Sequence, residues 1–158
     1  MRIGINALYL IPGKTGGMSV YLINYLKYLQ EIDTENEYYI YTSTEGAASL
    51  NITAPNFHKV RCPMPARLRS FHYFWELFIL PFQALKDRIE LLHSTANIAP
   101  IYLPCKSVIT IHDIRPYFIS SDFPRSFTYM YKKLLPLMAK HAARVITVSE
   151  YSKKAISD

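Results

Sequence analysis

Short apolar runs alternate along the chain with longer segments whose apolar positions recur at helical spacing. The run Val108–Ile111 has four apolar or β-branched residues in a row without polar alternation, which is typical of a strand buried on both faces. Five further runs rich in β-branched or aromatic residues predict strands, at Arg2–Leu8, Glu37–Ser43, Phe57–Arg61, Ile89–Ser94 and Arg144–Val148.

Segments of helical period lie between the predicted strands. The first begins near Met18, the second and third cover Ser70–Lys86 and Arg125–His141, and the fourth, after the last strand, passes through Tyr151 and Ile156. In the second of them a stripe with Trp75 at its centre is expected to face the core, and Pro81 to kink or split the helix. The stripe consists of Phe71, Phe74, Trp75, Phe78 and Phe82.

The alternation of strands and helices predicts an α/β fold with a Rossmann-like, doubly wound and mostly parallel sheet. Right-handed crossovers place the carboxyl ends of all strands at one edge of such a sheet. Open α/β sheets bind their ligands there. The polar groups expected to converge at this edge are the Gly16-Gly17 loop, His93, His112 and Ser149.

The composition fits one globular domain and excludes disorder, because 50% of the 158 residues are hydrophobic and 19% are charged. A formal net charge of +6 favours anionic partners such as nucleotide phosphates or acidic lipid. No long basic run or nucleic-acid-binding motif occurs, so no nucleic-acid partner is expected. Cys62 and Cys105 lack metal or redox spacing, which favours free thiols and a cytoplasmic location.

The loop Gly13–Gly17 follows the first predicted strand. Adjacent glycines let a backbone approach a ligand closely, and the following helix presents free N–H groups, so a phosphate suits this loop. A P-loop would need a glycine at Leu8, and no G-x-G-x-x-G follows the strand. The alternative is a flexible turn.

His112 and Asp113 directly follow the buried run Val108–Ile111. An imidazole at a strand end is a candidate general base, hydrogen-bond donor to a ligand hydroxyl or metal ligand, and Asp113 would orient it or cap the next turn. The alternative is a structural histidine. No metal-ligand spacing and no nucleophile elbow occur, so neither a metal nor a cofactor is expected.

Three further polar residues follow or end strands. Taken alone, His93 is interpreted as a core or loop-capping residue and Asn97 as a turn residue. Ser149 is interpreted as a helix cap, because a serine hydroxyl can accept a hydrogen bond from an unpaired backbone N–H.

Taken together, these motifs resemble the N-terminal domain of GT4-type glycosyltransferases, the group 1 retaining enzymes with the GT-B fold. The matching stretches occur in the family's order and cover nearly the whole chain. They are Gly16-Gly-Met-Ser-Val-Tyr21, Trp75-Glu-Leu with Leu80-Pro81, Leu92-His-Ser-Thr-Ala-Asn97, Ile109-Thr-Ile-His-Asp-Ile-Arg-Pro116 and Val145-Ile-Thr-Val-Ser-Glu-Tyr-Ser152.

The resemblance implies transfer of a sugar from a nucleotide-sugar donor to a hydroxyl acceptor, either a glycan or a lipid-linked molecule, with retained anomeric configuration. It places Gly16 and Gly17 at the donor diphosphate and His112 near the transferred sugar, with Asp113 beside it as the second catalytic candidate. The residues expected to line the cleft or the acceptor site are His93, Asn97 and Ser149.

A complete GT-B enzyme also has a second Rossmann-like domain that carries most of the donor site. We therefore expect residues 1–158 to be a single acceptor-side domain without that partner. Because stabilisation of the leaving-group charge would be largely missing, we expect the isolated domain to be inactive.

Two alternatives remain. One is a non-catalytic module that binds a partner through the surface a second domain would cover. The other is peripheral membrane binding through Arg61, Arg67, Arg69 and the aromatic residues of Phe71–Phe82.

Overall fold

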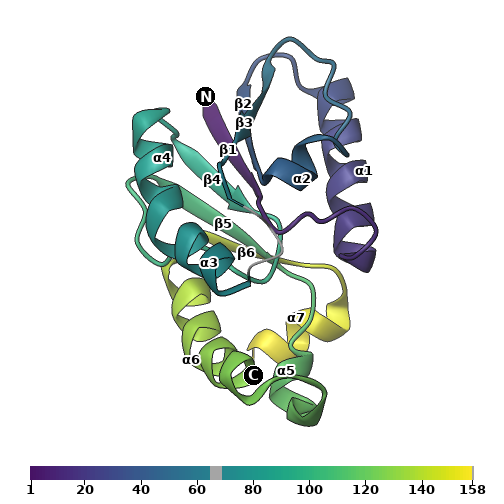
Figure 1. Cartoon of the computed structure of the whole chain (residues 1–158), viewed down its shortest axis with the longest axis vertical. Coiled ribbons are helices and arrows are strands. Elements are labelled where there is room, and N and C mark those ends of the chain that lie inside the picture. Colours follow the sequence, from purple (N-terminus) through teal and green to yellow (C-terminus); the bar gives the residue numbers. More distant parts are fainter. Residues whose placement is uncertain (65–68, 158) are drawn as a thin grey trace.

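The computed structural model describes residues 1–64 and 69–157. Within them, six strands form one sheet in the order β3-β2-β1-β4-β5-β6, and every neighbouring pair is parallel (Figure 1). The predicted strands are confirmed with bounds that differ by at most two residues. They are β1 (Arg2–Ala7), β2 (Glu37–Thr42), β3 (Phe57–Arg61), β4 (Leu91–Ser94), β5 (Lys106–Ile111) and β6 (Arg144–Thr147).

The chain reverses its direction across the sheet between β1 and β4. It runs outward through β1, β2 and β3, then crosses back to place β4 on the other side of β1, and continues through β5 to β6. This is the strand order of a Rossmann-like, doubly wound sheet, in which ligands bind outside the carboxyl ends of the strands at the reversal. The loops after β1, β4 and β5 are therefore the expected place for a site.

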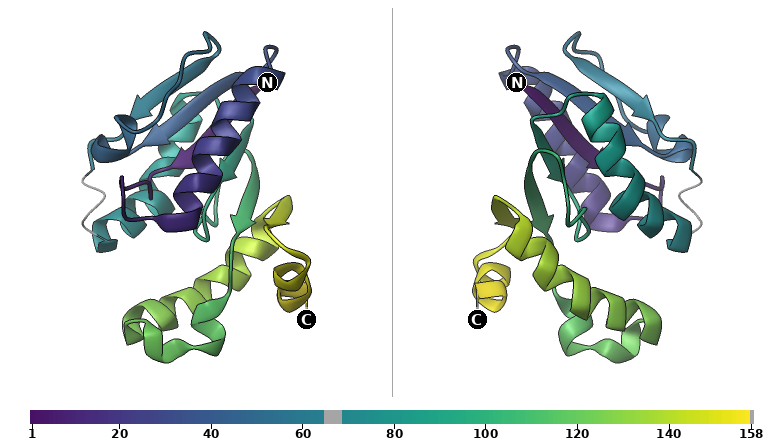
Figure 2. Two further views of the ribbon diagram at one scale, coloured as in Figure 1. Left: turned by 90° about the vertical axis from the view of Figure 1, so that its right-hand side faces the viewer. Right: turned by 90° about the vertical axis from the view of Figure 1, so that its left-hand side faces the viewer.

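Helices cover both faces of the sheet, with α1 (Gly16–Ile32) on one face and α4 (Leu80–Lys86) and α6 (Arg125–His141) on the other (Figures 1 and 2). The other helical elements are short. They are α2 (Thr44–Ala47), α3 (Arg69–Phe74), the π-helical segment η1 (Trp75–Ile79), α5 (Arg115–Phe118), the 3₁₀ segment η2 (Ser120–Asp122) and α7 (Glu150–Ser157).

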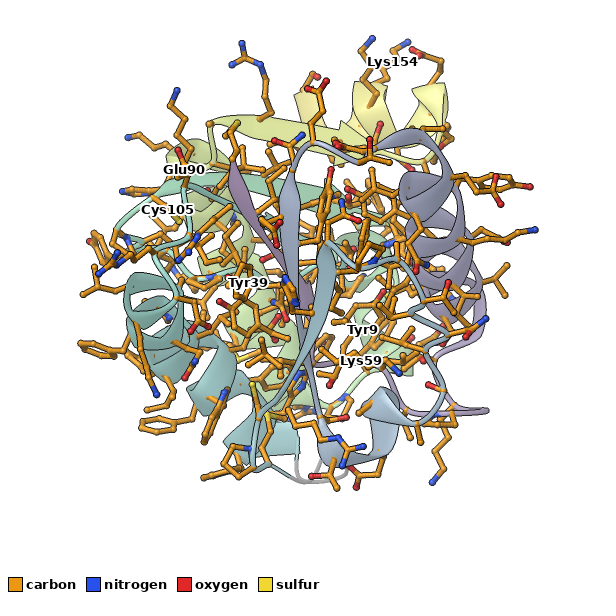
Figure 3. All side chains as sticks on the ribbon, turned by 90° about the horizontal axis from the view of Figure 1, so that it is seen from above. Tyr9, Tyr39, Lys59, Glu90, Cys105 and Lys154 are labelled. Carbon is orange, nitrogen blue, oxygen red and sulfur yellow. The ribbon has the colours of Figure 1, made fainter. Side chains whose placement is uncertain are left out.

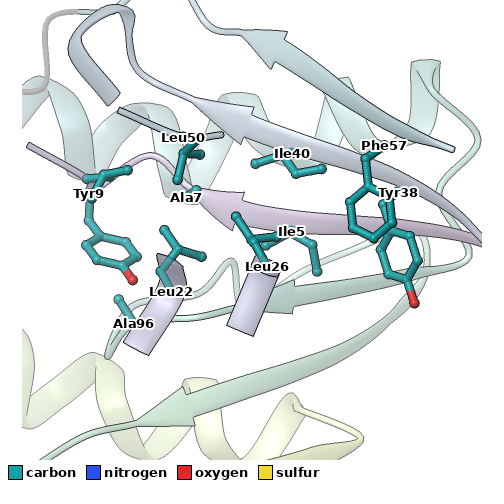
Figure 4. Close-up of a cluster of buried hydrophobic side chains, with 11 residues drawn as sticks. Ile5, Ala7, Tyr9, Leu22, Leu26, Tyr38, Ile40, Leu50, Phe57 and Ala96 are labelled. Atoms are coloured by element: carbon teal, nitrogen blue, oxygen red, sulfur yellow. The ribbon is translucent and has the colours of Figure 1, made fainter. Parts of the chain in front are cut away.

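One core lies between α1 and the strands β1 and β2. Ile5, Ala7 and Ile40 cluster there with Leu22 and Leu26 of α1, and all five side chains are fully buried (Figure 4). Burying a leucine or isoleucine side chain contributes about 1.5–3 kcal/mol, so this cluster fixes α1 against the sheet. The glycine loop that precedes α1 is thereby held at the carboxyl end of β1.

The opposite face of the sheet packs against the other helices. Leu92 of β4 clusters with Leu80 and Ala84 of α4, and Ile109 and Ile111 of β5 belong to a further cluster with residues of α6. Seen from above, side chains fill the space on both sides of the strands (Figure 3). The α6 residues buried in this layer are Thr128, Tyr131, Leu135 and Met138.

The segment after β3 departs most from the sequence prediction. Instead of one helix kinked at Pro81, it consists of α3, η1 and α4, and Pro81 lies in the first turn of α4. A proline fits there because the first N–H groups of a helix have no helical partner. The π-helical turn replaces the expected proline kink as the break in the helix.

The aromatic stripe of this segment faces solvent, so its prediction as core was wrong. Its four phenylalanines are 42–70% exposed, whereas Trp75 is partly buried against the cluster of α4. The buried residues of the same segment are His72, Glu76, Leu80 and Ala84.

Two segments outside the predicted helices also contain short helices. Ser43 caps α2, because its Oγ accepts a hydrogen bond from the backbone N–H of Gly46 at 3.0 Å. The loop after β5 contains α5 and η2.

Candidate active site

A cavity of about 730 Å³ lies at the carboxyl edge of the sheet, beside the point where the strand order reverses. Lys14 lines it from the loop after β1, Gly17 from the first turn of α1, Asn97 from the loop after β4, and His112 from the end of β5. Further lining residues come from α3, η1 and α6. The structure thus brings the glycine loop and the strand-end histidine to one cavity.

The glycine loop leads directly into α1. Gly13 and Gly16 have positive φ angles of 73° and 52°, a backbone conformation that favours glycine. A Cβ atom on Gly17 would meet nothing within 4 Å, so there is open space beside the backbone here. No side chain caps the first turn of α1, and its N–H groups together with the Lys14 ammonium suit an anion. Gly17 lines the cavity, but Gly16 does not.

His112 is held from two sides by the loop after β4. Its backbone N–H donates to Oδ1 of Asn97 at 2.7 Å, and its ring Nε2 lies 2.9 Å from the carbonyl oxygen of Thr95. The ring also meets the edge of the Tyr21 ring, with 5.0 Å between centroids and an interplanar angle of 86°. Backbone and ring are therefore both fixed.

The Thr95 contact determines which ring nitrogen of His112 can react. A carbonyl oxygen only accepts hydrogen bonds, so Nε2 must carry the hydrogen. In the neutral ring, Nδ1 then has a lone pair that can accept a hydrogen bond or a proton. Of the roles considered for His112, the general base fits this arrangement, and the neutral ring can also accept a hydrogen bond through Nδ1, whereas Nδ1 of the neutral ring cannot donate one.

Asp113 and Asn97 build the turn that follows β5. Oδ1 of Asp113 accepts a hydrogen bond from the backbone N–H of Arg115 at 3.1 Å, which caps the turn before α5. The carbonyl oxygen of Asp113 accepts from the Tyr131 hydroxyl at 2.9 Å and from Nδ2 of Asn97 at 3.4 Å. Both residues line the cavity with His112.

His93 lies in the core and is not part of the cavity lining. It is 4% exposed, and its ring nitrogens lie 3.2 Å from the hydroxyl of Tyr25 and 2.9 Å from the hydroxyl of Thr110. Burial lowers the pKa of His93 to about 4. The side chain therefore links α1 to the sheet as a neutral ring.

Ser149 also lies outside the cavity lining. Its Oγ accepts a hydrogen bond from the backbone N–H of Ser152 at 3.1 Å, so it caps α7 as its position predicts. Ser152 in turn donates to the carbonyl oxygen of His112 at 3.4 Å. Ser149 thus connects to the site only through the start of α7.

Sequence reasoning did not single out His72 and Glu76, although both line the cavity. Glu76 is 1% exposed, and burial raises its pKa to about 8; His72 is 8% exposed, and burial lowers its pKa to about 4. Nδ2 of Asn6, near the end of β1, donates a hydrogen bond to Oε1 of Glu76. The available signal was a glutamate within a strongly apolar segment, one helical turn after a histidine.

No group of three or more His, Cys, Asp or Glu side chains in residues 1–64 and 69–157 could hold a metal ion. Cys62 and Cys105 are free thiols. None of the helices in the described part of the chain is long and apolar enough to cross a membrane.

The fold is that of a Rossmann-like α/β domain with a cavity at the carboxyl edge of its parallel sheet. The family model described as Glycosyltransferase Family 4 matches residues 15–158, so the chain belongs to glycosyltransferase family 4. Its six-stranded parallel sheet is consistent with one half of a GT-B architecture. No curated protein sequence matches the chain.

Proposed function

We propose that residues 1–158 form the acceptor-side domain of a retaining glycosyltransferase, which moves a sugar from a nucleotide-sugar donor to a hydroxyl acceptor. Membership of glycosyltransferase family 4 supports glycosyl transfer in general. The observation that carries the finer proposal is that Gly17 and His112 line the same cavity at the strand reversal. A ligand with a phosphate at one end and a sugar at the other can contact both.

The donor diphosphate would lie against the glycine loop. The open space beside Gly17, the uncapped first turn of α1 and the nearby Lys14 all favour an anion at this position. Lys14 and Arg115 are the cationic residues among the lining of this cavity. We infer that a second domain supplies most of the charge that stabilises the diphosphate leaving group, and that the chain alone has little or no transferase activity.

His112 would accept a hydrogen bond from a hydroxyl of the transferred sugar through Nδ1, the ring nitrogen opposite the Thr95 contact. Asp113 would hold the turn that carries His112, through its bond to the backbone of Arg115. In this role Asp113 positions the site and does not touch the sugar.

The experiment is the substitution His112→Ala in the transferase that contains this domain. We expect turnover to fall about 10- to 100-fold, as for the loss of one strong hydrogen bond in the transition state. The matched control is His141→Ala, since His141 is exposed at the end of α6 and outside the cavity lining. Unchanged turnover in a folded His112→Ala enzyme would remove the assigned role.

The exposed aromatic stripe favours a second activity, which is peripheral binding to a membrane that contains anionic lipid. The side chains of Phe78 and Phe82 are 57% and 70% exposed. Of the arginines expected to accompany the stripe, Arg61 is exposed in β3, Arg69 begins α3 and Arg67 lies outside the described residues. Apolar side chains beside cationic ones are the features that hold interfacial helices on such surfaces.

Sedimentation with vesicles tests the membrane proposal. We expect the chain to bind vesicles that contain phosphatidylserine more strongly than vesicles of phosphatidylcholine alone, and the double variant Phe78→Ser/Phe82→Ser to lose this binding. Tyr28→Ser is the control, because Tyr28 is similarly exposed but lies on α1. Equal binding by the double variant and the parent chain would contradict the proposal.

A further inference from the structure

Glu76 and His72 form a buried polar pair in the wall of the cavity. They lie one helical turn apart, with Glu76 in the π-helical segment η1 and His72 in α3, and Nε2 of His72 is 3.4 Å from Oε2 of Glu76. π-Helical turns are frequent at functional sites, where they aim a side chain that a regular helix would turn away.

Asn6 fixes the orientation of the Glu76 carboxyl group. Oδ1 of Asn6 accepts a hydrogen bond from the backbone N–H of Leu8 at 3.2 Å, so the amide Nδ2 faces Oε1 of Glu76 and donates to it. The second carboxyl oxygen, Oε2, is thereby directed toward His72.

Within the described residues, neither Oε2 of Glu76 nor Nε2 of His72 makes a hydrogen bond, although both atoms are buried. A buried polar atom without a partner costs about 1–3 kcal/mol, so such a pair calls for a physical explanation. A single ligand hydroxyl can donate to one of these atoms and accept from the other, because a hydroxyl has both a hydrogen and lone pairs.

We propose that Glu76 and His72 form a subsite for a hydroxyl of the acceptor, separate from the hydroxyl that reacts. The subsite shares the cavity with His112 and Gly17, so an acceptor that uses it must carry at least two hydroxyl groups. The acceptor class is therefore a sugar or another polyol. This inference rests on the proposed function, because it assumes that the cavity receives the acceptor.

The pKa shifts of Glu76 and His72 indicate the charge of the pair at neutral pH. Burial raises the pKa of Glu76 to about 8 and lowers that of His72 to about 4, so both groups are mostly uncharged. An uncharged acid and an uncharged imidazole bind a neutral hydroxyl without burying a net charge.

Saturation-transfer NMR on the chain tests the subsite, with methyl α-glucoside and methyl α-mannoside as polyol probes and 1-propanol as the single-hydroxyl comparison. We expect one or both glycosides to bind more strongly than 1-propanol. His72→Phe, which leaves the Asn6 bond to Glu76 in place, and Glu76→Leu should each weaken glycoside binding at least tenfold. Glu76→Gln should keep it within about threefold, since the amide retains the Asn6 bond and a polar group toward His72.

Binding of UDP and GDP is measured on the same samples, so that the two proposals can fail separately. Lost glycoside binding with intact nucleotide binding in His72→Phe supports the subsite. Glycoside binding by His72→Phe and Glu76→Leu at the parent level, or no glycoside binding by the parent chain, overturns it and leaves the glycine-loop assignment standing. Absence of nucleotide binding alone counts against the proposed function and not against the subsite.

Discussion

His112 and His93 both lie near a strand end, yet the structure gives them different surroundings. His93 is still within β4, where its side chain points from the face of the sheet into the core, whereas His112 follows the last residue of β5 and reaches the cavity. The sequence predicts the strand ends that carry both residues. It cannot predict which ring faces the cavity, because a shift of one position turns a side chain to the opposite face of a strand and the end of the strand is known only to within a residue or two.

Which ring nitrogen of His112 keeps a free lone pair depends on neighbours that no sequence pattern specifies. The Thr95 carbonyl and the Asn97 side chain that hold His112 belong to an irregular loop, whose path is set by tertiary packing. Glu76 escaped prediction for a related reason, since its burial follows from a π-helical turn that apolar periodicity does not reveal.

The raised pKa of Glu76 predicts a loss of stability toward alkaline pH. In the folded chain the Glu76 carboxyl group keeps its proton up to about pH 8, whereas in the unfolded chain it loses the proton near its ordinary pKa of 4.5. Between these values the folded state binds more protons, so the free energy of unfolding falls as pH rises. His72 and His93, whose pKa values are lowered to about 4 from the ordinary 6.5, act in the opposite sense, because the unfolded chain binds their protons until the pH is well above 6.5.

A comparison with Glu76→Gln isolates Glu76, because the amide does not titrate and the histidines contribute equally to both proteins. Between pH 6.5 and 8 we expect the parent chain to lose about 1.5 kcal/mol more unfolding free energy than Glu76→Gln. Urea denaturation at both pH values measures this. The same loss in both proteins would show that Glu76 is not the group responsible.

At the scale of elements, the segment from α3 to α4 shows that helical periodicity alone does not predict which face of a helix is buried. It carries two apolar stripes, one with Phe78 and Phe82 and one with Leu80 and Ala84, and the pattern alone does not say which stripe faces the sheet. The smaller residues are buried because α4 packs closely against the strands, while the larger phenylalanines point outward. In α1 as well, apolar side chains lie on more than one face: Leu22 and Leu26 are buried, whereas Val20, Ile23 and Tyr28 are exposed.

This orientation gives an element-scale prediction. Leu80→Ala should lower the free energy of unfolding by about 2–5 kcal/mol, because Leu80 is fully buried. Phe78→Ala should change it by less than about 0.5 kcal/mol, because the ring is 57% exposed. Equilibrium denaturation of the two variants distinguishes the faces, and a larger loss for Phe78→Ala would mean that the helix is turned the other way.

At the scale of the whole molecule, the parallel sheet follows from the alternation of strands and helices along the chain. The sequence does not state that β4 pairs with β1, yet this pairing creates the strand reversal and places the loops after β1, β4 and β5 around one cavity. The fold class could thus be predicted from the pattern of residues, while the composition of the cavity required the packed structure.

The central claim is that the glycine loop and His112 contact one ligand. NMR titration of the isotope-labelled chain with millimolar UDP-glucose and GDP-mannose tests it most directly. We predict that, for at least one of the two, the Gly17 amide and the His112 ring resonances shift together with a common dissociation constant, while the His141 ring does not respond. Shifts at only one of the two sites, two different dissociation constants, or no shift at either site with both compounds would contradict the account.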